Sequence, residues 1–258
     1  MYAPPVYIVA MSTQLKCSSC LTLVSPTQAL RVPVISGFAD RLGNGASTLT
    51  HLSPDNQILV DANYGRSVDA FCQPCAYKVS ELIDEPAQRA ASKLQDSPPL
   101  RLTADDQSAL LRWALKTAAL TVFTGPEHQH AGARILLSRI FHPPRRKYRK
   151  GGIIARTAPF TSATSANFFF ISGSITFSVT SIALGETCIS AYQADGRSAD
   201  DLRNLYLDRT TEVVNYYGVR IGEDRTPVQF DPAQREFSDP SLFRDVVQDL
   251  RRIMSALG

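Results

Sequence analysis

The chain has 258 residues, of which 44% are hydrophobic and 20% are charged, so it can bury a substantial core. This composition excludes a disordered tail and a miniprotein that depends on disulfides, and the formal net charge of +3 is too small to indicate a nucleic-acid partner by itself. The sequence has no run of eighteen uncharged apolar residues, and residues 1–5 (Met-Tyr-Ala-Pro-Pro) lack the charged and apolar regions of a secretory signal. We therefore expect a cytoplasmic protein with no membrane partner.

Two CxxC pairs lie in the N-terminal part of the chain. A short strand is predicted at residues 6–10 (Val-Tyr-Ile-Val-Ala), ahead of Cys17 and Cys20. Cys72 and Cys75 follow after 51 residues whose Gly, Pro and Asn favour loops and short strands. A two-residue gap lets both sulfurs of a tight turn reach one tetrahedral ion, so the spacing predicts a zinc site of four thiolates. Two alternatives remain open, a thioredoxin-like redox pair and two unrelated surface pairs.

Helices are predicted on both sides of residue 100. Apolar residues recur at three- and four-residue spacing over 79–94, with Pro86 as the expected interruption. A clearer helix begins after Thr103, the predicted cap, with Asp106 three residues further on. Its apolar residues form one stripe, which predicts an amphipathic helix that ends at Gly125-Pro126.

The next stretch of the chain is strongly basic. Between Glu127 and Glu186 there is no acidic residue, and Tyr148 lies among five cations within residues 145–150. Such a composition pairs with phosphates while the ring stacks on a base. We expect residues 134–156 to bind DNA or RNA; the alternatives are a solvated loop and a surface for an acidic protein partner. The eight cations of the interval are Arg134, Arg139, Arg145, Arg146, Lys147, Arg149, Lys150 and Arg156.

The C-terminal part is predicted to be β-rich. Residues 151–192 contain several runs of β-branched and aromatic residues, and residues 174–182 largely alternate apolar residues with Ser or Thr, which predicts a strand with one solvent-facing side. The fifth cysteine, Cys188, lies in an apolar stretch and is expected to be a small buried residue and no metal ligand. A closing helix is predicted over residues 240–257.

The helix after Thr103 contains the sequence Leu-Leu-Arg-Trp-Ala-Leu-Lys-Thr-Ala-Ala-Leu over residues 110–120, in which Trp113 and Lys116 lie off the centre of the apolar stripe. Together with the CxxC pairs, this stretch resembles a group of bacterial HNH-endonuclease-like proteins. Their members carry a first CxxC, a Glu-His-Val-x-Pro-like segment, a second CxxC followed by Asn and a Leu-Glu pair, and a helix close to Leu-Ala-x-Trp-Ala-x-Lys-Thr-Ala. The resemblance covers about residues 14–156, is strongest over 72–120, and implies a zinc-pinned, ββα-metal-like module related to zinc ribbons.

The catalytic positions of that group differ here. In HNH enzymes a histidine activates the attacking water, and a metal stabilises the charge that develops on the phosphate. The corresponding segment reads Ala-Leu-Arg-Val-Pro over residues 29–33, so Leu30 takes the place of the histidine. Ala76 stands where the Asn is expected, and Ile83-Asp84 replaces the Leu-Glu pair. The resemblance therefore implies a retained zinc scaffold and a lost catalytic centre.

Other residues are candidates for a displaced catalytic centre. In an active nuclease, His51 would be the base and Asp84 the remaining acid. A second metal ion would need ligands near the first site, and the candidate ligands are the histidines, Asp61, Asp69 and Asp84. Glu127, His128 and His130 lie close together in the sequence and either bind a metal ion or belong to a polar loop. His142 is either a structural residue or part of the basic surface.

We therefore expect an α+β protein with two parts. Residues 1–100 form the zinc-pinned, HNH-derived module, and residues 101–258 form the central amphipathic helix, the β-rich portion and the closing helix. The leading hypothesis is a zinc-binding, catalytically inactive protein that binds nucleic acid or acts as an accessory factor. The alternatives are an active metal-dependent HNH-type endonuclease, and a structural or assembly protein with a zinc-stabilised fold.

Overall fold

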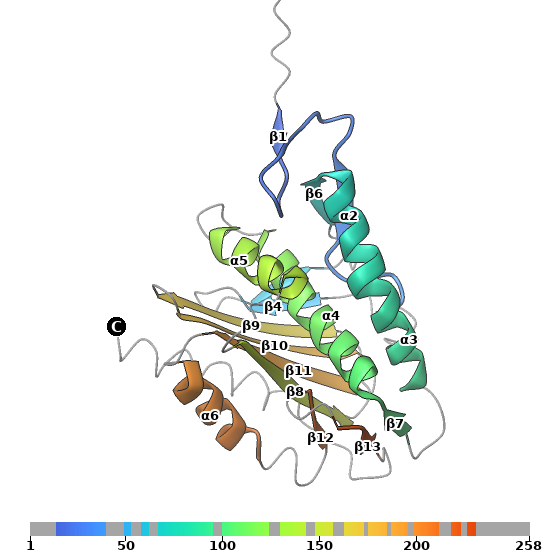
Figure 1. The fold of residues 1–258 in the computed structure, drawn as a ribbon, viewed down its shortest axis with the longest axis vertical. Helices are drawn as coiled ribbons and strands as arrows, with labels where there is room; N and C mark the ends of the chain where they lie inside the picture. The colour runs from blue at the N-terminus through green and yellow to red at the C-terminus, as the bar shows by residue number, and fades with distance from the viewer. Residues whose placement is uncertain are drawn as a thin grey trace, which may run out of the picture.

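The computed structural model of the chain shows a mixed α+β fold (Figure 1). Helix α4 (Ala104–Phe123), flanked by α5 (His130–Phe141), covers one face of a central sheet, and α6 (Ala199–Arg209) covers the other. No helix among the described residues is long and apolar enough to cross a membrane. The predicted strand at residues 6–10 and the predicted closing helix at residues 240–257 lie outside the residues that the structure describes. The structure describes residues 14–39, 49–52, 58–61, 67–94, 100–123, 130–142, 148–156, 163–172, 175–184, 187–195, 199–211, 218–222 and 226–230.

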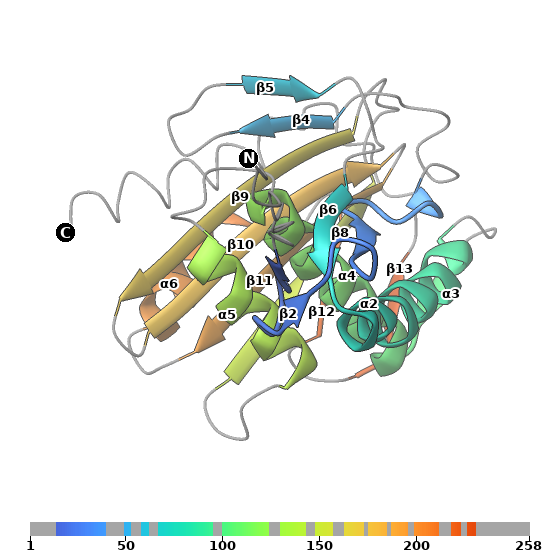
Figure 2. The same cartoon turned by 90° about the horizontal axis from the view of Figure 1, so that it is seen from above.

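Among the described residues, the central sheet has seven strands in the order β12-β8-β11-β10-β9-β4-β5. Neighbouring strands are antiparallel except β4 and β9, which are parallel. The strands β4 and β5 come from the stretch between the two cysteine pairs, so this stretch extends the edge of a sheet built from the C-terminal half (Figure 2). The strands are β4 (Leu49–Leu52), β5 (Ile58–Asp61), β8 (Tyr148–Arg156), β9 (Ala163–Ser172), β10 (Ile175–Leu184), β11 (Thr187–Asp195) and β12 (Gly218–Ile221).

Both faces of the sheet are covered at β11. Gln193 of β11 lies opposite Lys150 of β8, whose Nζ donates to Ser108 Oγ of α4 at 2.8 Å. Three residues earlier, Ser190 Oγ accepts a hydrogen bond of 2.9 Å from the Tyr206 hydroxyl of α6. Because successive side chains of a strand point to opposite faces, α4 and α6 lie on opposite sides of the sheet.

The prediction of a solvent-facing side for the strand at residues 174–182 is wrong. Ser178 and Thr180 of β10 are fully buried, and Ser178 lies opposite Gln193 on the face that α4 covers. The alternation of apolar with small hydroxyl residues marks the two faces of the strand correctly. The polar face is dry because a helix, which the local sequence of the strand does not reveal, packs against it.

The N-terminal part forms a smaller frame of two antiparallel strands and a helix. In this frame β3 (Leu30–Pro33) pairs with β6 (Ser67–Phe71), and α2 (Gln73–Val79) follows β6 directly. A short hairpin of β1 (Leu15–Lys16) and β2 (Leu23–Val24) lies beside these elements and is counted as part of the frame.

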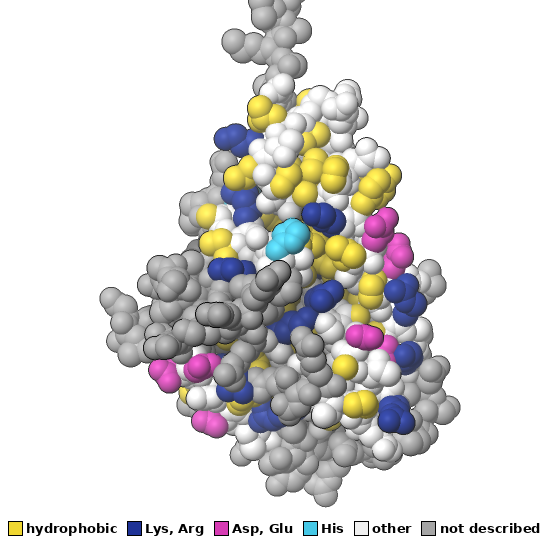
Figure 3. All heavy atoms as spheres, in the orientation of Figure 1, with side chains coloured by type: hydrophobic (Ala, Val, Ile, Leu, Met, Phe, Trp, Pro, Cys, Tyr) yellow, Lys and Arg dark blue, Asp and Glu magenta, His cyan; other side chains and the backbone are white. Residues whose placement is uncertain are grey.

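The frame also carries an apolar surface. Hydrophobic side chains gather over β6 and α2 in Figure 3. Within the part of the chain that the structure describes, all of the exposed large hydrophobic residues lie between residues 21 and 82: Leu21, Leu23, Leu30, Tyr77 and Leu82.

The helical region after the second cysteine pair is continuous but irregular. A π-helical segment, η1 (Ser80–Asp84), joins α2 to α3 (Glu85–Lys93), and the Glu85 N–H donates to the Ser80 carbonyl five residues back. Pro86 lies in the first turn of α3 and has no N–H to donate. The helix runs on through Pro86, so the predicted interruption there is wrong; the irregularity is the widened turn of η1, which ends at Asp84.

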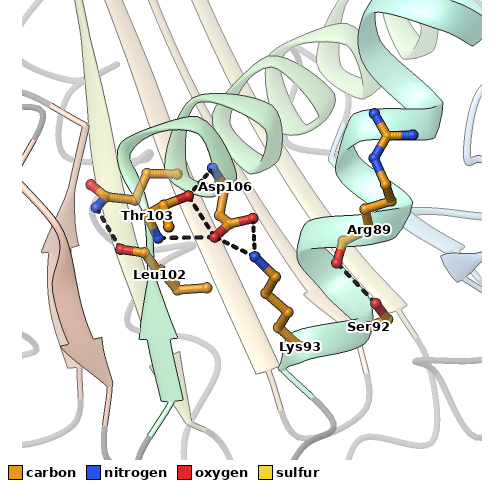
Figure 4. Close-up of polar contacts among 7 residues, drawn as sticks. Arg89, Ser92, Lys93, Leu102, Thr103 and Asp106 are labelled. Atoms are coloured by element: carbon orange, nitrogen blue, oxygen red, sulfur yellow. Dashed lines mark hydrogen bonds and ion pairs between the residues drawn. The ribbon is translucent and has the colours of Figure 1, made fainter.

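Helix α4 begins with the predicted cap. Asp106 Oδ2 accepts from the Thr103 N–H at 2.9 Å and from its hydroxyl at 2.7 Å, and Thr103 Oγ1 accepts from the Asp106 N–H at 3.2 Å (Figure 4). This is a capping box with Asp in place of the usual Glu or Gln. Lys93 Nζ lies 2.7 Å from both carboxylate oxygens, which ties α3 to the start of α4. Burial of Asp106 opposes its ionisation, but the hydrogen bonds from Lys93 and Thr103 outweigh burial and lower the pKa of the carboxyl group.

The prediction that this helix is amphipathic is wrong. Fifteen of the 20 residues of α4 are buried, because the helix contacts α3 and α5 as well as the sheet. Three of its buried polar residues, Asp106, Gln107 and Lys116, are bonded to other segments. Gln107 donates to the carbonyls of Leu102 and Thr226 and accepts from the Gly222 N–H. These bonds join α4 to β7 (Leu100–Leu102), to the residue that follows β12 and to the segment that leads into β13 (Val228–Phe230), the strand that pairs with β7.

Candidate metal centre

The four cysteines of the CxxC pairs meet at one point of the frame. The Sγ atoms of Cys17, Cys20, Cys72 and Cys75 all lie within 4.8 Å of one another. Cys17 follows β1, and Cys72 caps α2 directly after β6. Of the residues whose placement is described, these are the one group of three or more His, Cys, Asp or Glu side chains that could hold a metal ion.

A tight loop turns both sulfurs of the first pair toward the second pair. The Leu21 N–H donates to the Cys17 carbonyl at 3.0 Å, and the Cys17 N–H donates to the Thr22 carbonyl at 2.8 Å. Leu21 has a φ of 65°, a left-handed conformation that side chains other than Gly seldom adopt. The Ser18 N–H also donates to the Ala70 carbonyl at 2.8 Å, which fixes the loop against the strand that leads to the second pair.

The arrangement of the sulfurs fits a structural metal such as Zn²⁺. With zinc–sulfur bonds of about 2.3 Å, tetrahedral coordination places neighbouring sulfurs about 3.8 Å apart. The Sγ atoms of Cys20 and Cys72 are 3.6 Å apart, and the Cys72 N–H donates to Cys17 Sγ at 3.3 Å. Cys188 is buried in β11 and is not part of the cluster, as predicted for a small buried residue.

The cysteines differ in how readily they ionise. Burial opposes ionisation of Cys20, but hydrogen bonds with the Thr22 hydroxyl and backbone outweigh it and lower the pKa of the thiol to about 6. Burial raises the pKa of Cys72, and burial together with the Cys72 side chain raises that of Cys75. A divalent cation would supply the positive charge that Cys72 and Cys75 need in order to ionise together.

A second polar cluster joins the frame to α4. Lys116 of α4 has a fully buried ammonium group, which lies 3.1 Å from Asp84 Oδ1 and donates to Ser36 Oγ at 3.0 Å and to the Val34 carbonyl at 3.2 Å. Ser36 Oγ in turn donates to Asp84 Oδ1 at 2.6 Å and accepts from Trp113 Nε1 at 3.0 Å. Burial lowers the pKa of Lys116, and the Asp84 carboxylate opposes that shift.

This cluster explains two of the sequence motifs structurally. Trp113 and Lys116 of the α4 stretch and Asp84 of the Ile83-Asp84 pair meet at Ser36, three residues after β3. Sequence reasoning named Asp84 as a candidate catalytic acid and missed its contact with Lys116. The available signal was a lysine within an apolar helix, since a buried cation requires a counter-charge.

The other predicted site residues do not join the cysteine cluster, as far as the structure describes their side chains. His51 lies in β4, with its backbone opposite Leu59 and Ser165, and β4 belongs to a different sheet from β3 and β6. Asp69 of β6 forms an exposed ion pair with Arg31 of β3, with 2.8 Å between Oδ1 and Nε. Of the remaining metal and surface candidates, His130 begins α5 and His142 follows its end, whereas the side chains of Asp61, Glu127 and His128 lie outside the described residues.

The basic segment is described only in part. Arg145, Arg146 and Lys147 lie outside the described residues, and β8 begins at Tyr148. Lys150 is directed toward α4, where it donates to Ser108. Earlier in the segment, the guanidinium carbon of Arg134 lies 5.8 Å from the centre of the Phe123 ring, a cation–π contact between α5 and α4.

Comparison of the chain with protein families, curated proteins and solved structures gives no match. The assignment of a function therefore depends on the chemistry of the residues described above. The four-cysteine cluster is the feature with the most specific chemistry.

Proposed function

We propose that the chain is a zinc-binding protein whose metal, held by Cys17, Cys20, Cys72 and Cys75, stabilises an HNH-derived, ββα-metal-like frame without nuclease activity. The observation that carries the proposal is the convergence of four sulfurs beside two antiparallel strands and the helix that follows them. A closed set of four thiolates suits a structural zinc ion, because no coordination position remains for water or substrate.

The residues of the frame support an inactive centre. Leu30 lies in β3 opposite Phe71, and Ala76 lies in α2, next to the second cysteine pair. Neither side chain can accept a proton or bind a metal ion. Asp84, the remaining acidic candidate, is engaged by Lys116 and Ser36. At these three positions the chain thus offers no free base to activate water, and we interpret the frame as a scaffold for binding.

The role proposed for this scaffold is nucleic-acid binding or an accessory function. Support for nucleic-acid binding comes from the composition of residues 145–150, in which five cations flank one tyrosine. Because Lys150 is directed toward Ser108, the phosphate contacts are assigned to Arg145, Arg146, Lys147 and Arg149.

Two measurements test the zinc scaffold and its inactivity. Elemental analysis of untagged protein should give one zinc per chain, unchanged in Cys188→Ser and lost in Cys17→Ser. The protein should leave plasmid DNA intact in Mg²⁺, Mn²⁺ or Ni²⁺. Cleavage that disappears in His51→Ala would contradict the proposal and favour the active endonuclease.

The nucleic-acid role is tested by the salt dependence of binding. Replacing Arg145, Arg146 and Lys147 with Ala should flatten the log–log salt slope on duplex DNA by about two to three units, because each phosphate contact contributes about −0.9. Tyr148→Ala should weaken binding with little change in slope, since stacking releases no ions. The exposed Arg89 of α3 provides a matched control, whose replacement with Ala should leave both quantities unchanged. A wild-type protein that binds neither duplex nor single strands at low salt contradicts this role.

A structural or assembly role is a second candidate. The observation that favours it is the exposed apolar surface of the frame, to which Leu21 and Leu23 contribute. If this surface holds a second copy of the chain, the mass measured by light scattering should rise with protein concentration, and Leu21→Ser with Leu23→Ser should abolish the rise. A concentration-independent monomer mass removes the support for self-assembly.

A further inference from the structure

We propose that the cysteine cluster is also an oxidative modification site, at which a hydroperoxide joins Cys20 to Cys72 in a disulfide and releases the metal. The inference rests on the proposed zinc binding and adds a form of regulation to it. It names one pair among the six that four cysteines allow.

The exposure of the four cysteines singles out this pair. Cys17 and Cys75 are buried, with 0% and 8% of their surface exposed, whereas Cys20 is exposed and Cys72 is partly exposed. A hydroperoxide arriving from solvent therefore meets Cys20 first. The Cys72 sulfur lies 3.6 Å from it and provides a resolving thiolate without a large movement of the backbone.

The chemistry balances with hydrogen peroxide, the simplest hydroperoxide, as the oxidant. The Cys20 thiolate attacks the peroxide oxygen, the O–O bond breaks, and Cys20 becomes a sulfenic acid while hydroxide leaves. The Cys72 thiolate then attacks the Cys20 sulfur, the S–S bond forms, and a second hydroxide leaves. Two protons from solvent convert both hydroxides into water, and the two electrons that reduce the peroxide come from the two sulfurs. A zinc ion held by the four thiolates would lose two of its ligands and be released.

The disulfide would connect the same two chain segments that the metal connects. Cys20 belongs to the loop between β1 and β2, and Cys72 directly precedes α2, so the new bond spans the two CxxC pairs. A bond between these segments constrains the unfolded chain across the 51 intervening residues. The frame should therefore remain folded after the metal leaves, and a thiol reductant should restore the site. A disulfide within either CxxC pair would leave the two segments unconnected.

The test is titration of the zinc-loaded full chain with hydrogen peroxide. Released zinc is followed with a chromophoric chelator, disulfides are mapped by mass spectrometry of unreduced peptides, and folding is followed by circular dichroism. We expect one zinc released per Cys20–Cys72 disulfide, a fall from five free thiols to three, retained secondary structure, and recovery with dithiothreitol and zinc. A disulfide within a pair, oxidation to sulfinic acid without a disulfide, or unfolding on metal release would overturn the proposal.

Two variants complete the experiment. Cys188→Ser should release zinc and form the same disulfide as the wild type. Cys75→Ser retains the reacting pair and should still form the Cys20–Cys72 disulfide even if its zinc affinity falls; formation of a different disulfide in this variant counts against the proposal. Absence of zinc before peroxide is added would contradict the zinc scaffold, whereas zinc that stays bound under peroxide contradicts only the oxidative step.

Discussion

Lys116 is held by contacts that come from two other segments of the chain, residues 34–36 and Asp84. Its ammonium group has no exposed surface and is balanced by Asp84, Ser36 and the Val34 carbonyl. Asp84→Ala would leave this buried charge without its counter-ion, which typically costs about 3–5 kcal/mol. We therefore expect a large loss of unfolding free energy in urea titrations of the zinc-loaded variant. The double variant that carries both Asp84→Ala and Lys116→Met should recover most of the lost stability. If it is no more stable than Asp84→Ala alone, the two residues are not coupled.

The same variant should show a characteristic dependence on pH. Burial lowers the pKa of Lys116 in the folded protein, and removing Asp84 removes the interaction that opposes this shift. The folded-state pKa is then below the unfolded-state value, so the unfolded chain binds more protons in the interval between them and stability rises with pH there. The deficit of Asp84→Ala is therefore complete below the folded-state pKa and should shrink as the pH rises toward 10. Urea titrations at pH 7 and pH 9.5 check this sign.

At the scale of residues, the sequence predicts which cysteines form a site, but it does not predict which side chains far apart in the sequence contact each other. The CxxC spacing predicts which cysteines gather, because a two-residue gap limits where two sulfurs can lie. Their convergence is found in the structure. The contact between Asp84 and Lys116 could not be predicted in the same way, since 31 residues separate them and only the packing of α4 brings them together.

At the scale of elements, β8 and α4 approach closely at Gly152. A Cβ atom at this position would lie 2.1 Å from the Ser190 carbonyl oxygen and 2.8 Å from a methyl group of Leu111. We expect Gly152→Ala to reduce stability by about 3 kcal/mol or more, because the backbone of β11 would have to move. Gly37→Ala is the matched control, since a Cβ there meets nothing within 4 Å and should change stability by no more than about 0.5 kcal/mol. Thermal denaturation of the two variants compares them, and an equal loss would contradict the close approach.

The local sequence predicts where α4 begins, but it does not predict which other elements pack around the helix. Its first turn was predictable because the Thr103–Asp106 capping box is made within four residues. Its burial on all sides was not, because the residues that cover it come from α3, α5 and the sheet. The helices α5 and α6 were not predicted at all; their mixed apolar and charged residues give a weak periodic signal in isolation.

At the scale of the whole molecule, metal binding should be linked to proton release. The pKa values of Cys72 and Cys75 are raised in the metal-free cluster, and zinc binds the thiolate forms. Zinc must therefore displace at least about two protons at neutral pH, and log K for zinc should rise by about two or more per pH unit. The affinity is lost as the pH falls. Competition titrations with a chromophoric chelator between pH 6.5 and 8 measure this slope, and a slope near zero would contradict binding by these thiols.

The path of the chain between the cysteine pairs has a consequence for the order of folding. After β3 the chain adds β4 and β5 to the edge of the large sheet, then returns as β6 to pair with β3. Once the frame closes, the segment that carries β4 and β5 has its ends fixed close together, and much of the loop-closure entropy has already been lost. The parallel pairing of β4 with β9 joins residues more than 100 positions apart and is the slower step on topological grounds. The frame would thus act as a nucleation site, with the outer two strands of the sheet joining last.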